Sequence, residues 1–237
     1  MTARGKRYLE ARSKIDLSKK YSIEEAMGLV KEISTADFNE TIEVSLSLGV
    51  NPSQNMVRGT SVLPNGTGKE VKVLAFASGE KHQEAEQAGA DWVGGEDLAE
   101  KIEDGWLEFD EVVTTPDMMS VVGKLGRVLG PRGMMPSPKS NTVTEDIGNA
   151  VEKLKKGQVE FRTDQYGIVH VPIGKSSFSS EELKENLVDL VSSVLDQRPE
   201  DGIQGRYLQA LTVSSTMGPG IKVEIDQVRR EASGRNL

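Results

Sequence analysis

The sequence contains no cysteine, which excludes both a disulfide framework and a thiolate metal site. Its two histidines, His82 and His170, lie far apart, which argues against a zinc site built on histidine. No run approaches the roughly 20 apolar residues that a membrane-spanning helix needs, and the N-terminus is polar and basic rather than signal-like. We therefore expect a cytoplasmic protein with no metal, no cofactor and no membrane partner.

Basic residues are in the minority, since 37 Asp and Glu outnumber 29 Lys and Arg and give a formal net charge of -8. This balance argues against a protein that coats nucleic acid over its whole surface. The charge is unevenly distributed, because the first twenty residues are rich in Lys and Arg while much of the acid lies in the middle of the chain. The sign must therefore be interpreted segment by segment.

One stretch of that acidic middle is itself basic. Met118 to Asn141, which we call the basic segment, contains no acidic residue. Four glycines and three prolines recur in it, so we predict a short helical start followed by a rigid, tightly turned loop. Such a loop can bring cations close to an anion, or it can be an ordinary surface connection. The cations are Lys124, Arg127, Arg132 and Lys139.

The chain carries no phosphate-binding fingerprint. Gly123-Lys124 is followed by Leu125 instead of Ser or Thr, and no G-x-G-x-x-G occurs. We also find no plausible acid–base pair and no serine in a nucleophile-elbow motif. A nucleotide-binding enzyme is therefore the weaker hypothesis.

Both ends of the chain combine amphipathic helices with strands that are apolar on one face. Capping boxes at Ser22 with Glu25 and at Ser179 with Glu182 predict the starts of two helices. Strict alternation predicts that the first strand is buried on one face only. The expected strands are residues 41–48, 57–63, an antiparallel hairpin of 158–164 and 168–174, and a final pair within 206–226 that turns at 218–220.

The middle of the chain has a different pattern. Continuous apolar strands alternate with helices, which is typical of a small parallel α/β unit. Its ligand crevice would lie beyond the carboxyl ends of the strands. Thr144 should introduce the last helix, and Gly157 should close it. The expected strands are residues 71–77, 91–93 and 111–115, and the expected helices are residues 81–90, 96–105 and 147–156.

Because the first and last thirds share one pattern, we predict a discontinuous α+β domain made of residues 1–66 and 157–237. The α/β domain, residues 67–156, would be inserted into it. Two chain crossings in Gly-rich stretches would make a natural hinge.

The sequence of the basic segment, GKLGRVLGPRGMMPSPK followed by TVT, closely resembles the signature of the bacterial ribosomal protein L-one family. The similarity extends over nearly the whole chain, through TADFNETIEV, VRGTSVLPNGTGK, EQAGADWVGGEDL, FDEVVTTPDMM, EFRTDQYGIVHVPIGK and TVSSTMGPG. The resemblance implies an α+β domain formed by both termini, an inserted Rossmann-like α/β domain and a two-strand hinge between them.

The resemblance also implies a function. Members of the family are constituents of the large ribosomal subunit, bind its rRNA at the mobile stalk next to the tRNA exit site, and assist movement and release of deacylated tRNA. In bacteria they repress translation by binding their own mRNA leader. The implied partners are large-subunit rRNA, tRNA in the exit site, the protein's own mRNA and the large ribosomal subunit. A free-standing mRNA regulator would use the same RNA face, so the sequence leaves that alternative open.

Carried over position by position, the resemblance implies an RNA face of hydroxyls, close backbone approach and aromatic or Met side chains. Asp37 and Gln165 stand where relatives often carry Lys, and each change implies one lost phosphate contact. Core packing is the alternative role for Phe161 and Met217, and a hydroxyl bonded within the protein is the alternative for Thr216. The implied RNA-binding residues are Phe38, Thr41, Phe161, Asp164, Ser214, Thr216, Met217 and Gly218.

Two basic regions would add to this face. The four cations of the basic segment would form an auxiliary electrostatic surface for rRNA or tRNA. The N-terminal arm, GKRYLEARSKIDLSKKY, either helps to hold rRNA phosphates or is merely a solubilising helix.

Overall fold

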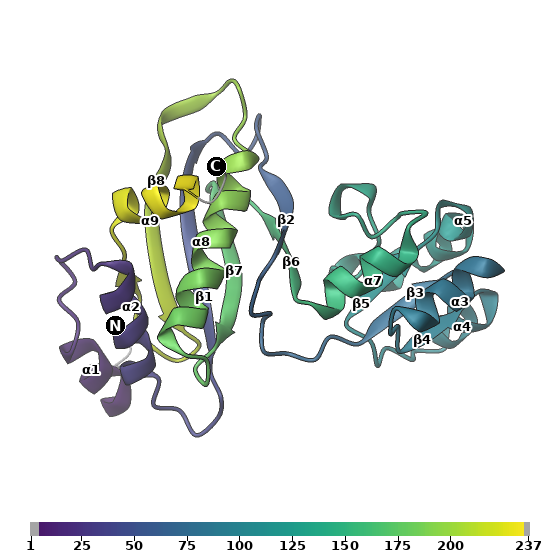
Figure 1. The fold of residues 1–237 in the computed structure, drawn as a ribbon, viewed down its shortest axis with the longest axis horizontal. Coiled ribbons are helices and arrows are strands. Elements are labelled where there is room, and N and C mark those ends of the chain that lie inside the picture. Colours follow the sequence, from purple (N-terminus) through teal and green to yellow (C-terminus); the bar gives the residue numbers. More distant parts are fainter. Residues whose placement is uncertain (1–4, 235–237) are drawn as a thin grey trace. The chain divides into compact units, whose positions relative to one another are not determined.

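A computed structural model describes residues 5–234 and contains two compact units (Figure 1). Unit 1 comprises Met1–Gly68 and Val159–Leu237, and unit 2 comprises Lys69–Gln158. Residues 1–4 and 235–237 of the expected terminal domain lie outside the described range. The expected mixture of helices and strands in several sheets is confirmed. None of the helices within the described range has both the length and the apolar character that a bilayer crossing requires.

Unit 1 is built around a four-stranded antiparallel sheet of order β7-β1-β8-β9. Helices α2, α8 and α9 pack together and against this sheet, where they share one apolar core. The predicted alternation in β1 is confirmed, because Val44 and Leu46 are buried while Glu43 and Ser45 point to the other, more open face. The elements are α1 (Lys6–Ser13), α2 (Ile23–Ile33), β1 (Thr41–Val50), β7 (Ile168–Lys175), α8 (Ser180–Asp196), β8 (Ile203–Ser215), β9 (Ile221–Lys222) and α9 (Ile225–Gly234).

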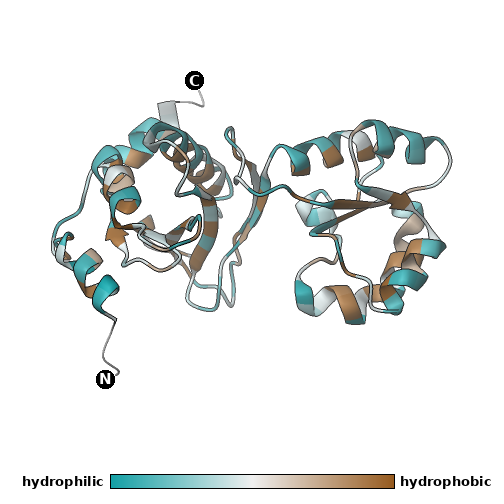
Figure 2. Cartoon of the chain, turned by 90° about the horizontal axis from the view of Figure 1, so that it is seen from below, coloured by the Kyte–Doolittle hydropathy of each residue, from teal (hydrophilic) through white to brown (hydrophobic). Residues whose placement is uncertain are grey.

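Both predicted capping boxes are confirmed. The Ser22 hydroxyl accepts from the Glu25 N–H and the Ser179 hydroxyl accepts from the Glu182 N–H, while each glutamate carboxylate accepts from the cap residue's N–H. Each cap contributes about 1 kcal/mol and fixes where its helix begins. Figure 2 shows that the apolar residues of α2 and α8 gather on the side that faces the sheet.

The predicted hairpin of residues 158–174 is only partly present. Its turn exists, because the Asp164 N–H donates to the Ile168 carbonyl at 2.8 Å. Beyond one bridge between Thr163 and Val169, however, β6 (Gln158–Arg162) pairs with β2 (Arg58–Val62) in a separate two-stranded sheet. The expectation of a simple hairpin was wrong, because β7 finds its partner in β1 instead.

Unit 2 contains a three-stranded parallel sheet of order β4-β3-β5. As predicted, β3 is buried on both faces. Leu74 and Phe76 pack with α4 and the basic segment, and Val73 and Ala75 pack with α3 and α7. The elements are β3 (Val73–Phe76), α3 (Glu80–Gln87), β4 (Trp92–Gly94), α4 (Glu96–Glu103), β5 (Glu111–Thr114) and α7 (Ile147–Lys155).

The start of α7 differs from the expectation. Asp146 is the capping residue, and its carboxylate accepts from the Asn149 N–H at 3.2 Å. Thr144 stabilises the turn before the helix, because its hydroxyl accepts from the Asp146 N–H. Gly157 follows the helix with a φ of 97°, a left-handed conformation that favours glycine.

The basic segment is helical over more of its length than predicted. Val121, Leu125 and Leu129 are spaced four apart and are buried in the core beside β3. This spacing outweighs the low helix propensity of glycine, so the expected loop is confined to the stretch after Gly133, whose φ of 74° ends the helical run. The short turns are η1 (Pro116–Met118), α5 (Met119–Val122), η2 (Gly123–Leu125), α6 (Gly126–Leu129), η3 (Gly130–Arg132) and η4 (Pro138–Ser140).

Candidate nucleic-acid interface

Thr41 and Thr216 bond to each other where β1 begins and β8 has just ended. The Thr216 N–H donates to the Thr41 carbonyl at 3.0 Å. The Thr216 hydroxyl accepts from the Thr41 N–H at 3.0 Å and donates to the Thr41 carbonyl at 3.2 Å. The Thr41 hydroxyl in turn accepts from the Lys175 ammonium at 2.8 Å. Two hydroxyls and one cation therefore meet at this end of the sheet.

Two large apolar side chains lie on the loops next to these residues. Phe38 is 54% exposed and Met217 is 51% exposed. The loops that carry them are tied together by Glu40, whose side chain is buried at 1% exposure. One Glu40 oxygen accepts from the Ala36 N–H at 3.0 Å, and the other accepts from the Met217 N–H at 2.9 Å. We call this ensemble the Thr41–Thr216 edge.

The open face of the sheet continues from this edge. Residues opposite one another in the register share a face, so Glu43 lies beside Ser214 and Ser45 lies beside Thr212. The Ser45 hydroxyl is also 3.1 Å from His170 Nδ1. Along β8, buried residues alternate with more exposed ones from 210 to 216. The alternation breaks before residue 210, where the register with β1 shifts and Tyr207 and Leu208 are both buried. The resulting surface is rich in hydroxyls and carries few cations.

Asp164 lies away from the Thr41–Thr216 edge. Thr41 pairs with Lys175 at one end of β7, whereas Asp164 precedes Ile168 at the other end. Its carboxylate accepts from the N–H groups of Ile168 and Tyr166 at 2.9 and 2.8 Å, and it faces His170. The Ile168 hydrogen bond, with support from Tyr166 and His170, lowers the pKa of Asp164 below its ordinary value. Asp164 therefore shapes the turn and keeps it anionic.

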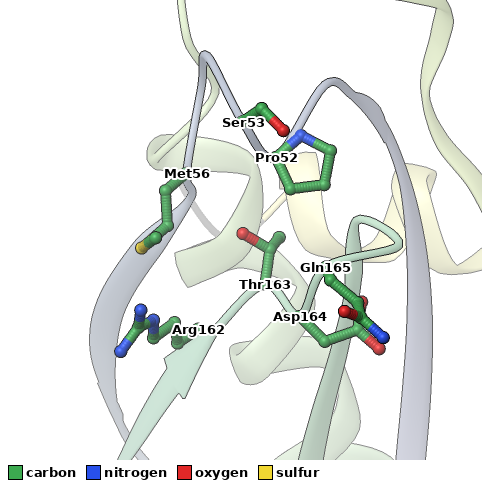
Figure 3. A pocket seen from close by; sticks show the side chains of 7 residues that line it. All are labelled: Pro52, Ser53, Met56, Arg162, Thr163, Asp164 and Gln165. Atoms are coloured by element: carbon green, nitrogen blue, oxygen red, sulfur yellow. The ribbon is translucent and has the colours of Figure 1, made fainter.

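A pocket of about 480 Å3 lies beside this turn, and Figure 3 shows the side chains that line it. The Thr163 hydroxyl in it is already bonded to the backbone of Val57. Arg162 is exposed and forms no ion pair within the described chain, so it is the group in this pocket that remains available to an anion. The lining residues are Pro52, Ser53, Met56, Arg162, Thr163, Asp164 and Gln165.

Phe161 does not belong to any exposed face. It is 1% exposed and lies in the core of unit 1, where a Cβ added at Gly59 would approach its ring to 2.8 Å. The interpretation of Phe161 as an RNA-facing side chain is therefore corrected to core packing. Gly218 has a packing reason of its own, since a Cβ there would meet the buried Ser215 hydroxyl at 2.5 Å.

The four cations of the basic segment belong to unit 2. All four are exposed, and none of them forms an ion pair within residues 5–234. By contrast, Lys155 pairs with Asp91 and Lys156 pairs with Glu152 in the same unit. Gly123, Gly126 and Gly130 precede or separate the first three of these cations in helical conformation, and an added Cβ would meet nothing within 4 Å. The surface therefore carries exposed cations, and at its glycines the backbone is not covered by a side chain.

Sequence reasoning missed two residues of the Thr41–Thr216 edge. Lys175 lies beside Thr41 because β7 runs antiparallel to β1, a pairing that no local pattern reveals. Glu40 looks like an ordinary surface acid in the sequence, and only the tertiary structure buries it. In the described part of the chain, no group of His, Asp and Glu side chains is arranged to hold a metal ion.

Residues 30–219, which include the Thr41–Thr216 edge and the basic segment, match the ribosomal protein L1p/L10e family. The large ribosomal subunit protein uL1 of Solidesulfovibrio magneticus is 50% identical over 236 residues, which cover 99% of this chain and 100% of that protein. The match thus extends through both units and leaves no large segment unaligned. The chain belongs to the ribosomal protein L1p/L10e family.

Proposed function

We propose that this protein is a constituent of the large ribosomal subunit and that unit 1 binds large-subunit rRNA. Family membership and the name of the 50% identical relative support the ribosomal role. The observation that carries the RNA site is the Thr41–Thr216 edge, where two hydroxyls meet Lys175 and the adjoining loops carry two half-exposed apolar side chains. The Thr41 hydroxyl, the Lys175 ammonium and backbone groups can bond 2′-hydroxyls and phosphates in a shallow minor groove, and Phe38 and Met217 can pack on riboses or bases. Because these contacts do not require a strongly basic surface, such a face is compatible with a net charge of -8.

The proposal extends to the finer role that the resemblance implies. The protein would bind rRNA at the stalk next to the tRNA exit site, assist movement and release of deacylated tRNA, and repress its own mRNA by binding the leader. Unit 1 would be the rRNA-binding domain and unit 2 the inserted domain. The two chain crossings would form the hinge, and the positive φ of Gly66 and of Gly157, 66° and 97°, supports a role for glycine there.

The basic segment supports an auxiliary contact within this role. Its unpaired cations can neutralise phosphates of rRNA or tRNA without first breaking an internal ion pair. Neutralising all four should weaken RNA association modestly and reduce its salt dependence. Complete loss of binding would instead make the basic segment the principal site.

The test has two parts. First, the protein should remain in large subunits washed with salt; RNA binding without such retention would point to a free-standing mRNA regulator. Second, Phe38→Ala and Met217→Ala should each weaken binding of a large-subunit rRNA fragment about 5- to 150-fold, the range for loss of one stacking contact. Val62→Ala is the control, because Val62 is also exposed but lies on β2. Equal effects at all three positions would refute the proposed face.

A further inference from the structure

A surface pocket of about 620 Å3 lies between the start of α1 and the turn that follows β8. Its lining comprises four consecutive residues of the N-terminal arm together with Met217 of the Thr41–Thr216 edge. The arm and this turn are almost the full chain apart in sequence, so only the fold brings them together. The lining residues are Gly5, Lys6, Arg7, Tyr8 and Met217.

The two cations of this pocket differ from Lys14 and Lys19 further along the arm. Lys14 pairs with Glu32 at 2.8 Å, and Lys19 pairs with Glu25 at 3.2 Å. Lys6 and Arg7 are exposed and form no ion pair within the described residues. No carboxylate of the described residues therefore lies within ion-pairing distance of either cation, and an external anion need not displace a salt bridge to reach them.

Met217 offers an apolar surface whose backbone is fixed. Its side chain is half-exposed, and its N–H is held by the buried Glu40 carboxylate at 2.9 Å. The pocket thus joins apolar surface from Met217 and Tyr8 with the two cations Lys6 and Arg7. An unpaired nucleotide has the matching chemistry, since a flat base lies next to an anionic phosphate.

We infer that this pocket takes one unpaired nucleotide of the bound RNA. The base lies against Met217 and Tyr8, and the adjoining phosphate lies against Lys6 and Arg7. The volume falls in the range of small-ligand sites and is sufficient for a nucleotide. The inference rests on the proposed function, because RNA on the Thr41–Thr216 edge is what brings a nucleotide to Met217.

Two double variants of the full chain test the cations. The probe is the rRNA fragment that the wild-type protein protects from nuclease. Lys6→Gln with Arg7→Gln should weaken binding and reduce the magnitude of the salt slope by about 1.4 to 1.8, as expected for two lost phosphate contacts. Lys14→Gln with Lys19→Gln removes the same charge from paired positions and should leave the slope nearly unchanged. Equal effects of the two double variants would overturn the pocket in favour of diffuse attraction by the arm.

The nucleotide is tested by replacing each unpaired position of that fragment with an abasic residue. One replacement should weaken wild-type binding about 5- to 150-fold, and the same replacement should add little once Met217→Ala is present. If no single position behaves in this way, the pocket does not hold a nucleotide. If the wild-type protein binds the fragment specifically but neither the Lys6 and Arg7 variant nor any abasic replacement changes that binding, this inference alone is overturned. If the wild-type protein does not bind the fragment specifically, the proposed function is overturned.

Discussion

The Thr216 hydroxyl already has both of its roles filled within the protein, since it accepts from the Thr41 N–H and donates to the Thr41 carbonyl. Thr216→Val keeps the β-branched shape but strands the Thr41 N–H. We expect it to lower the free energy of unfolding by about 1 to 2 kcal/mol, the cost of two exposed hydrogen bonds. Chemical denaturation of the variant measures this loss.

Thr216→Ser is the control, because it keeps the hydroxyl and should retain most of that stability. The resemblance implied that the Thr216 hydroxyl serves RNA. The structure favours the alternative in which the protein itself bonds this hydroxyl. A stable Val variant that binds RNA more weakly would restore the first interpretation. The resemblance named both Thr41 and Thr216, but no local pattern could show that their backbone and hydroxyl groups bond to each other.

Glu40 should act on RNA binding without touching RNA. In Glu40→Gln one oxygen becomes an NH2 group, which faces a backbone N–H and cannot accept from it, so one of the two loops loses its anchor. We expect RNA affinity to fall about 5- to 30-fold through misplacement of Phe38 or Met217. The free energy of unfolding should fall by about 1 to 2 kcal/mol, because one buried hydrogen bond is lost. Fluorescence titration with the rRNA fragment measures this change.

Tyr207→Phe is the matched control for Glu40→Gln. It removes one buried hydrogen bond, from the Tyr207 hydroxyl to the Val194 carbonyl at 3.0 Å, in the same unit. It should lower stability without a change in RNA affinity. If both variants weaken RNA binding in proportion to their stability loss, Glu40 has no positioning role.

At the scale of elements, substitution of a glycine in the basic segment should change stability and RNA binding in opposite directions. Gly126 has a φ of -54°, and an added Cβ would meet nothing within 4 Å. Gly126→Ala should therefore stabilise unit 2 by about 0.5 to 1 kcal/mol. If the bare helical face approaches RNA, the same change should reduce the contribution of the basic segment to RNA binding.

Gly59→Ala is the contrasting change, because its Cβ would approach the Phe161 ring to 2.8 Å and should destabilise unit 1. Thermal unfolding of both variants, followed by RNA titration of Gly126→Ala, checks the pair. A Gly126→Ala protein that is stabilised and binds RNA normally would show that the bare face has no partner.

The same elements show what local pattern can predict. Capping boxes and strict alternation placed α2, α8 and β1 correctly, because these signals are satisfied within a few residues. The pairing of β6 with β2 depends on residues about 100 positions apart, such as Arg58 and Glu160, whose side chains meet at 2.6 Å. The helical run of the basic segment was predictable from the spacing of its buried Val and Leu. The prediction of a loop instead gave more weight to its glycines and prolines.

At the scale of the whole molecule, unit 2 carries two acids that make it sensitive to low pH. Burial alone would raise the pKa of Asp91, but hydrogen bonds from Lys155 and the Val73 N–H lower it below its ordinary value. Burial also opposes ionisation of Asp110, whose pKa is nevertheless lowered by Lys69 and the Lys72 N–H. A carboxyl group with a lowered folded pKa stabilises the fold above its unfolded pKa, about 3.9, and this stabilisation is lost as pH falls through the folded pKa.

We therefore expect the stability of unit 2 to decline below about pH 4, and Asp91→Asn to flatten that decline. Tryptophan fluorescence suits the measurement, because both tryptophans of the chain, Trp92 and Trp106, lie in unit 2 and contact each other edge to face. An unchanged acid profile in Asp91→Asn would assign the sensitivity to other groups.

Removing unit 2 tests the division of labour in the molecule. The described core of unit 1 draws its apolar residues from both ends of the chain, and the two cores of unit 2 draw theirs only from the middle. A shortened chain that joins residues 1–68 directly to residues 159–237 therefore keeps one complete core together with the Thr41–Thr216 edge. It should fold and retain specific affinity for the rRNA fragment, while the magnitude of its salt slope falls by about 0.7 to 0.9 for each phosphate contact that the basic segment makes. Circular dichroism establishes folding before RNA is added. A folded shortened chain that binds every RNA equally would place part of the specific face in unit 2, and an unchanged salt slope would remove the basic segment from the interface.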